Sequence, residues 1–165
     1  MNRSPWLALA LLALLLAPAA VQAQDMNVAL NRLKTPAQPG TECSPTTADA
    51  IIEYCKVHDN TNEGIYVSNA DNPAVTISYT AVYGNGAEGI YSSGSPTDIL
   101  YCTIAANGSS GGVELASSTG NAITSCIIAS NTGYGVTCTS ATPSITYSDV
   151  WGNTSGEYSG CSAGT

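Results

Sequence analysis

An asparagine that recurs five times at a nearly constant interval is the feature that most constrains how this chain can fold. The intervals between successive copies are 25, 22, 24 and 22 residues. A period in this range is typical of solenoids, in which each repeat forms one turn of a coil and stacks on the next. The five copies are Asn60, Asn85, Asn107, Asn131 and Asn153.

Other residue types keep fixed positions relative to each asparagine. An isoleucine stands eight residues before it, a small residue five before it, and a valine or isoleucine three before it. A glycine followed by an apolar residue comes shortly after it in the first four repeats. These glycines are Gly64, Gly89, Gly112 and Gly135. The last repeat departs from the pattern and reads Gly156-Glu157-Tyr158.

A repeat of this length is too short for a strand, a helix and their return connection, but it accommodates three short strands. We therefore predict an all-β fold, a parallel β-helix of about five rungs in which equivalent residues stack about 4.8 Å apart. The asparagines are expected in left-handed backbone at sharp bends, with amides bonded from rung to rung, and the glycines where a bend needs positive φ. A β-sandwich would leave the common register unexplained.

The repeat units resemble those of a known family of exported proteins. Residues 52–65, 77–90, 99–113 and 123–136 are similar to the right-handed parallel β-helix repeats of the pectate-lyase-like superfamily. The resemblance implies a right-handed, single-stranded β-helix with stacked Asn turns. It implies no single activity, because this fold hosts lyases, hydrolases, esterases and adhesins.

The N-terminal part of the sequence predicts export. Residues 1–23 have a basic start, a Leu- and Ala-rich core and a small residue at Ala23, as a signal peptide does, and no second long apolar run follows to span a membrane. We expect residues 24–50 to form an N-terminal cap and loop, with a short helix after Asp25 that ends before Pro36. Residues 51–165 then form the β-helix, interpreted as a truncated piece of a longer solenoid.

The distribution of charge excludes several classes of partner. The formal net charge is −8, and the sequence after Lys56 contains eight Asp and Glu residues but no Lys or Arg. Nucleic acids, anionic membranes and polyanionic sugars are poor partners for such a surface. A polysaccharide or a cell-surface glycan is the predicted partner, and the oligomeric state is left open.

The sequence contains no recognisable catalytic constellation. Enzymes of the resembled superfamily use Arg or Lys beside carboxylate-bound calcium, paired Asp with a Gly-His-Gly segment, or two Asp with an Arg. The rungs after Lys56 lack these cations, and His58, the single histidine, stands beside Asp59 without a partner that indicates general-base chemistry. We predict no catalytic residue and interpret His58 as a surface residue.

A calcium site is one hypothesis for two stacked carboxylates. Glu63 and Glu88 each follow their asparagine by three residues, so they are expected on adjacent rungs, where a shared cation would relieve their repulsion. Asp71 and Asp98 could join only if their loops fold back. The alternative is two solvated side chains that splay apart.

Tyrosines provide the predicted binding surface. One column stands six residues before the asparagines and is interrupted by Ser125; a shorter column stands six residues after them. The first comprises Tyr54, Tyr79, Tyr101 and Tyr147, and the second comprises Tyr66 and Tyr91. An exposed column can stack on sugar rings and offer hydroxyl groups. Alternatively, the rings only stabilise neighbouring strands.

Three cysteine pairs are disulfide candidates in an exported chain. Cys138 and Cys161 fall at near-equivalent positions on adjacent rungs, and we favour this pair. Cys102 and Cys126 share a column and could form either a disulfide or a stack of buried thiols. Cys43 and Cys55 could tie the cap to the first rung.

These observations favour a secreted β-helix module that binds carbohydrate or cell-envelope material without catalysis. The alternatives are a polysaccharide lyase or hydrolase of the pectate-lyase-like fold, and a structural or adhesin solenoid.

Overall fold

The computed structural model describes residues 50–68 and 74–163 of the chain. The predicted signal peptide, the predicted capping helix after Asp25, Cys43 and Asp71 lie outside these residues. Within the described ranges, no helix is long and apolar enough to cross a membrane.

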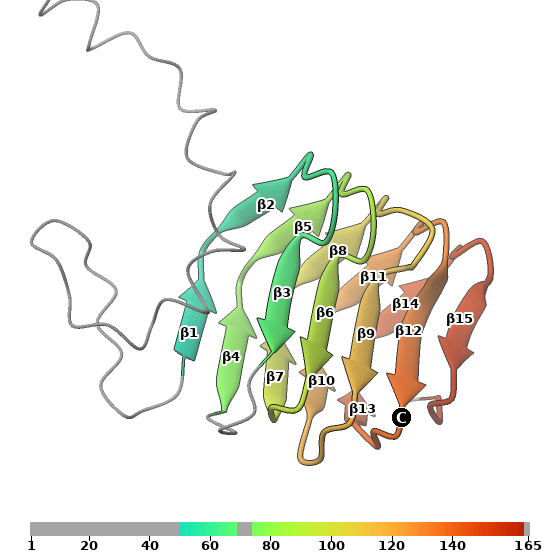
Figure 1. The fold of residues 1–165 in the computed structure, drawn as a ribbon. Coiled ribbons are helices and arrows are strands. Elements are labelled where there is room, and N and C mark those ends of the chain that lie inside the picture. Colours follow the sequence, from blue (N-terminus) through green and yellow to red (C-terminus); the bar gives the residue numbers. More distant parts are fainter. Residues whose placement is uncertain (1–49, 69–73, 164–165) are drawn as a thin grey trace, which may run out of the picture.

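The described residues fold into three parallel sheets, A, B and C, that wind around a common axis as a five-rung coil (Figure 1). Sheet A comprises β1 (Ala50–Glu53), β4 (Val75–Ser78), β7 (Thr97–Leu100), β10 (Ala122–Thr124) and β13 (Ser144–Thr146). Sheet B comprises β2 (Lys56–His58), β5 (Ala81–Tyr83), β8 (Thr103–Ala105), β11 (Ile127–Ala129) and β14 (Asp149–Trp151). Sheet C comprises β3 (Ile65–Ser68), β6 (Ile90–Ser93), β9 (Val113–Ala116), β12 (Tyr134–Thr139) and β15 (Gly156–Ser159).

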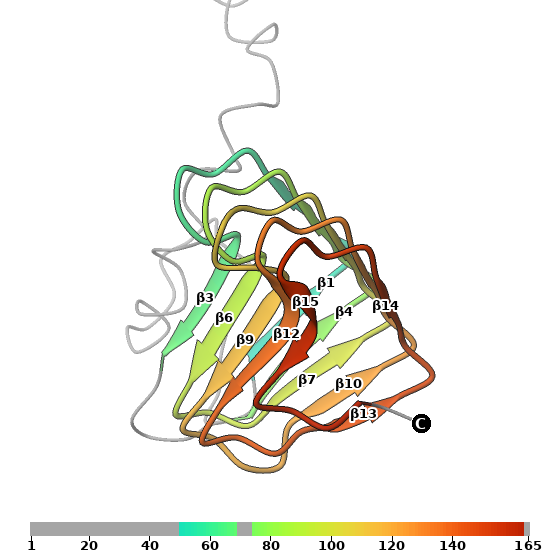
Figure 2. The same cartoon turned by 90° about the vertical axis from the view of Figure 1, so that its right-hand side faces the viewer.

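The register of the strands confirms the repeat found in the sequence. Each strand pairs with its counterpart one rung on, so that Ile77 lies opposite Ile52 on one side and Ile99 on the other. The end-on view in Figure 2 shows the successive turns superposed, with one sheet on each of three sides. The predicted parallel β-helix of about five rungs is therefore confirmed.

The core follows from the alternation of side chains along these short strands. The central isoleucine of each sheet A strand and the central Val or Ile of each sheet B strand point inward, and those of the middle rungs are fully buried. The buried residues in these two sheets include Ile77, Ile99 and Ile123 in sheet A, and Val82, Ile104 and Ile128 in sheet B. Sheet C closes the interior with Ile90, Val113 and Val136.

The corners between the sheets use left-handed backbone, but not at the asparagines. The corner between sheets A and B has positive φ at Tyr54, Tyr79, Tyr101, Ser125 and Tyr147. The corner between sheets B and C has it at Asp59, Gly84, Ala106, Ser130 and Gly152, each directly before an asparagine of the repeat. The prediction that the asparagines themselves adopt this conformation is therefore wrong. The preceding residue makes the bend, and this leaves the asparagine side chain directed into the interior.

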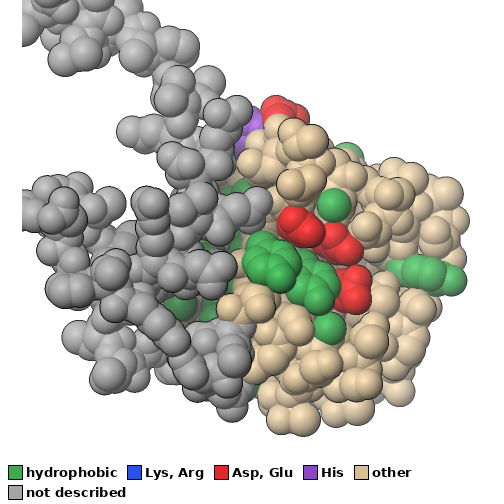
Figure 3. Space-filling model, viewed as in Figure 1, with side chains coloured by type: hydrophobic (Ala, Val, Ile, Leu, Met, Phe, Trp, Pro, Cys, Tyr) green, Lys and Arg blue, Asp and Glu red, His purple; other side chains and the backbone are tan. Residues whose placement is uncertain are grey.

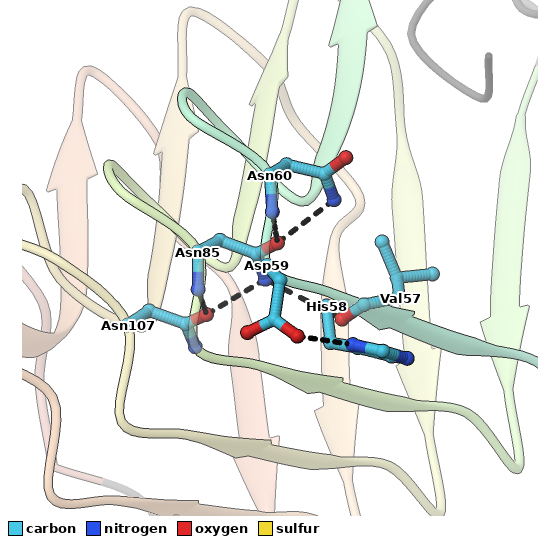
Figure 4. Close-up of polar contacts among 6 residues, drawn as sticks. All are labelled: Val57, His58, Asp59, Asn60, Asn85 and Asn107. Carbon is cyan, nitrogen blue, oxygen red and sulfur yellow. Dashed lines mark hydrogen bonds and ion pairs between the residues drawn. The ribbon is translucent and has the colours of Figure 1, made fainter. Parts of the chain in front are cut away.

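The asparagines form a continuous ladder of hydrogen bonds along the coil (Figure 4). Asn85 Nδ2 donates to Asn107 Oδ1 at 2.9 Å, and the backbone N–H of Asn85 donates to the same oxygen at 3.2 Å. Each amide after that of Asn60 also donates to a backbone carbonyl oxygen of the preceding rung; Asn107 Nδ2, for example, donates to that of Val82 at 3.2 Å. Each buried amide is thus satisfied from both neighbouring rungs, as predicted, which removes the cost of burying it.

Glycine recurs at this position of each rung for a steric reason and not for a conformational one. Gly64, Gly89, Gly112 and Gly135 do not have positive φ, so that part of the prediction is wrong. A Cβ at Gly89 would lie 2.6 Å from Asn107 Nδ2 and 2.8 Å from the carbonyl oxygen of Gly112. The asparagine of the next rung therefore occupies the space that a side chain would need.

The cysteines divide into one disulfide and a pair of buried thiols. Cys138 and Cys161 form a disulfide with a Cα–Cα distance of 5.3 Å, as favoured from the sequence. Cys102 and Cys126 are free thiols, so the disulfide candidate is wrong and the alternative holds. Each Sγ donates to backbone carbonyl oxygens. Cys102 donates to Leu100, and Cys126 donates to Ile99 and Thr124. The Cys43–Cys55 pairing stays a prediction.

Candidate binding surfaces

The first candidate surface is the corner between sheets A and B, called here the tyrosine corner: Tyr54, Tyr79, Tyr101, Ser125 and Tyr147. Each of these residues follows a strand of sheet A and has φ between 49° and 55°. The bend turns the five side chains away from the core and leaves the residue after each one, such as Cys126, directed inward. The structure therefore places the four tyrosines in a single exposed column.

Three of the rings form a stack. The Tyr54 and Tyr79 ring centroids are 5.1 Å apart, and those of Tyr79 and Tyr101 are 5.0 Å apart, with interplanar angles of 5° and 7°. Tyr79 is thus covered on both faces and presents its edge and hydroxyl group to solvent. A ligand that uses ring faces can reach only the two ends of this stack.

Tyr147 differs from the other three tyrosines. Among the described residues its ring contacts no other ring, and the residue is 84% exposed, against 53% for Tyr101. Left-handed backbone costs a non-glycine residue about 1–2 kcal/mol. A favourable ring contact contributes about 0.5–1.5 kcal/mol, so stacking offsets part of this cost for the first three tyrosines and none of it for Tyr147.

The second candidate surface lies on the outer face of sheet C. Tyr66 in β3 and Tyr91 in β6 stack with centroids 5.2 Å apart, and Glu114 in β9 takes the next position in this row. Figure 3 shows acidic side chains gathered beside the green side chains over these strands, and no Lys or Arg of the described residues is visible in this view.

Glu114 and Glu88 form a carboxyl pair on this surface. Burial, the negative charge of Glu88 and a hydrogen bond between the two carboxyl groups raise the pKa of Glu114 above its ordinary value. Glu88 is only 8% exposed. Two carboxyl groups in contact favour one shared proton, because two charges at this distance repel.

Among the described residues, the calcium hypothesis gains no additional ligand. Glu63 and Glu88 precede β3 and β6 on adjacent rungs, whereas Asp98 lies in β7 of sheet A, on another side of the coil. Residues 50–68 and 74–163 contain no group of three or more His, Cys, Asp or Glu side chains that could hold a metal ion.

His58 lies at the start of a short surface column on sheet B. Its ring stacks on that of Tyr83, with the centroids 4.9 Å apart, and its Nδ1 is 2.8 Å from Oδ2 of Asp59. Figure 4 shows the contact between His58 and Asp59, which is the next residue in the chain and is largely exposed. The contacts account for His58 as a surface residue.

Sequence reasoning did not identify Glu114 as a site residue. Glu114 stands seven residues after Asn107, whereas Tyr91 stands six residues after Asn85, because the loop after Asn107 is one residue longer. Only the strand register shows that Glu114 lies opposite Tyr91 and within reach of Glu88.

Comparison with known proteins gives one match. A family model described as a right-handed β-helix region matches residues 40–164, most of the chain. Neither a curated protein nor a solved structure matches.

Proposed function

The chain belongs to the right-handed β-helix family, and we propose that it is an exported, non-catalytic module that binds carbohydrate through its tyrosine corner. The β-helix fold supports membership of the pectate-lyase-like superfamily, in which one fold hosts several activities. The specific proposal therefore depends on the side chains at the surface and not on the fold.

The observation that carries the proposal is the conformation of Tyr147. Tyr147 has left-handed backbone, is 84% exposed and has no ring partner in the described part of the chain. A tyrosine is costly in this conformation, which Asn or Gly would adopt at low cost. Strained residues that packing does not explain are concentrated at functional sites. Tyr147 therefore supports a binding role more directly than the stacked tyrosines do.

The charge of the surface favours a neutral glycan. Lys56 is the only Lys or Arg among the described residues, and the carboxylates after it would repel uronic acids. Tyrosine edges and hydroxyl groups in a row can contact both the apolar faces and the hydroxyl groups of sugars.

A polysaccharide panel tests the proposal. The mature chain would be assayed for binding by affinity electrophoresis and, in the same samples, for new reducing or unsaturated ends. Binding without product supports a non-catalytic module, and a Tyr79→Ala/Tyr101→Ala double variant should then lose the binding. A panel that shows no binding would contradict the proposal.

The carboxyl pair on sheet C supports a second candidate function, a polysaccharide hydrolase. Glycosidic bonds are cleaved by a pair of carboxyl groups, and the raised pKa of Glu114 favours this residue as the acid of such a pair. The two groups are in hydrogen-bond contact here, closer than the roughly 5–9.5 Å of such pairs, so a substrate would have to separate them. Release of reducing ends by the wild type, with loss of release in both Glu88→Gln and Glu114→Gln, would favour this candidate over the first.

A further inference from the structure

We propose that the interruption of the tyrosine corner at Ser125 is a slot that accepts one pyranose ring of a neutral oligosaccharide between Tyr101 and Tyr147. This inference rests on the proposed function and specifies where on the tyrosine corner the sugar binds.

The spacing of the corner defines the slot. Thr146 pairs with Thr124, and Thr124 with Leu100, so Tyr101, Ser125 and Tyr147 follow three consecutive in-register strands. Tyr101 and Tyr147 are therefore separated by two rungs, about 10 Å. Filled positions of the corner place successive rings 5.0 Å and 5.1 Å apart. The gap at Ser125 thus has the thickness of one additional ring.

The walls and the rim of the slot have the mixed character that a sugar requires. Tyr101 closes one side with the ring face that Tyr79 does not cover. The Thr124 and Thr146 hydroxyl groups, 3.1 Å apart, lie on the sheet A side of Ser125, and Ile127, 47% exposed, lies on the sheet B side. Aromatic walls with a few hydroxyl groups match the alternating C–H faces and hydroxyl groups of a pyranose.

The neighbouring charge selects against anionic rings. Asp149 is exposed in the strand that follows Tyr147, and no Lys or Arg occurs after Lys56. A competing occupant is an aromatic side chain from a second copy of the chain, for which the exposed Trp151 is available. That occupant would make the slot a self-association site instead.

Ser125→Tyr tests the slot directly, because it fills the gap with a ring of the protein. Ser125 has φ 55°, the value that Tyr101 adopts, so the variant should fold normally, as circular dichroism and thermal melting would check. Ser125→Gly is the matched control that keeps the slot open. Tyr54→Ala removes a ring from the far end of the stack. Calorimetry with cellotetraose and chitotetraose would measure binding.

The expected result is at least a tenfold loss of affinity in Ser125→Tyr, a smaller loss in Ser125→Gly and Tyr54→Ala, and less than a twofold change in Tyr83→Ala, which lies on sheet B outside the tyrosine corner. Unchanged or tighter binding in Ser125→Tyr, with loss in Tyr54→Ala, would overturn the slot and leave binding along the stacked edges intact. Failure of the wild type to bind either oligosaccharide would also overturn the slot, whereas the polysaccharide panel decides the proposed function. If the wild type dimerises and Ser125→Tyr abolishes the dimer, the occupant of the slot is a second copy of the chain and not a sugar.

Discussion

Asn153 Nδ2 donates a hydrogen bond to Glu157 Oε2 at 2.9 Å, at the place where each earlier asparagine donates to the next one. Strand pairing sets Glu157 in register with Gly135, so a glutamate stands where the other four rungs have glycine. A further rung of the same geometry would bring its asparagine into the space of the Glu157 side chain. The irregular Gly156-Glu157-Tyr158 segment thus ends both the asparagine ladder and the glycine column.

Glu157→Ala should lower the free energy of unfolding by about 1 kcal/mol, because Nδ2 of the buried Asn153 loses its carboxylate acceptor and keeps only the carbonyl oxygens of Ile128 and Trp151. Urea denaturation followed by circular dichroism measures the change. Glu157→Gln, which keeps an acceptor oxygen, should recover most of it. Equal stability of Glu157→Ala and the wild type would show that Glu157 does not cap the ladder.

Asn107→Ala should be among the most damaging substitutions at a polar residue. Asn107 Oδ1 accepts from the backbone N–H and Nδ2 of Asn85, and its own Nδ2 donates to Asn131 Oδ1 and to the Val82 carbonyl oxygen. Removal leaves several buried groups unpaired, at a cost of roughly 3–5 kcal/mol. Asn60→Ala, at the half-buried end of the ladder, is the control and should cost about 1 kcal/mol. Similar losses for the two variants in urea denaturation would contradict a ladder that depends on burial.

Gly89→Ala separates steric crowding from backbone conformation. The added Cβ would lie 2.6 Å from Asn107 Nδ2, so we expect a loss of roughly 3 kcal/mol or more, or failure to fold. Gly120→Ala is the converse control, because Gly120 has φ 77° and nothing within 4 Å of an added Cβ. It should cost about 1–2 kcal/mol from backbone strain alone. A milder effect at Gly89 than at Gly120 in thermal melts would refute the steric explanation.

The carboxyl pair predicts a pH dependence of stability. The pKa of Glu114 is raised in the folded chain, so the folded state holds a proton that the unfolded state releases above the ordinary value of 4.5. Stability contributed by this group is present below that pH and is lost as pH rises through the folded pKa. Glu114→Gln should therefore melt at a higher temperature than the wild type at pH 8 and at a similar temperature at pH 4. The difference should be small, because Glu114 retains contact with solvent. Asp98→Asn, on sheet A, is the control. If it raises the melting temperature at pH 8 as much as Glu114→Gln does, the effect does not come from the contact between Glu88 and Glu114.

The coil itself was predictable because its core repeats. The isoleucine, small-residue and asparagine positions keep one spacing, and stacking of identical positions leaves a single register compatible with a buried Ile77, Ile99 and Ile123. The roles of residues within the bend were not predictable in the same way. The sequence shows that glycine and asparagine recur at the positions of Gly89 and Asn107, but only the three-dimensional structure shows that the amide of Asn107 lies against Gly89.

The candidate sites were only partly predictable for a related reason. Columns of tyrosine follow from the period, so Tyr54, Tyr79 and Tyr101 could be grouped from the sequence. Their left-handed backbone and the covered faces of Tyr79 depend on three-dimensional geometry. The contact between Glu88 and Glu114 joins residues whose offsets from their asparagines differ, so no fixed spacing reveals it.

Tyr147→Asn is the measurement that tests the binding account most directly. Asn adopts left-handed backbone readily, and Tyr147 has no ring partner among the described residues, so the variant should be as stable as the wild type or slightly more stable. Thermal melting and binding to the best ligand of the polysaccharide panel would be measured on the same samples. The account predicts at least a tenfold loss of affinity with an unchanged or higher melting temperature. A lower melting temperature with unchanged affinity would show that Tyr147 serves the fold and not a ligand.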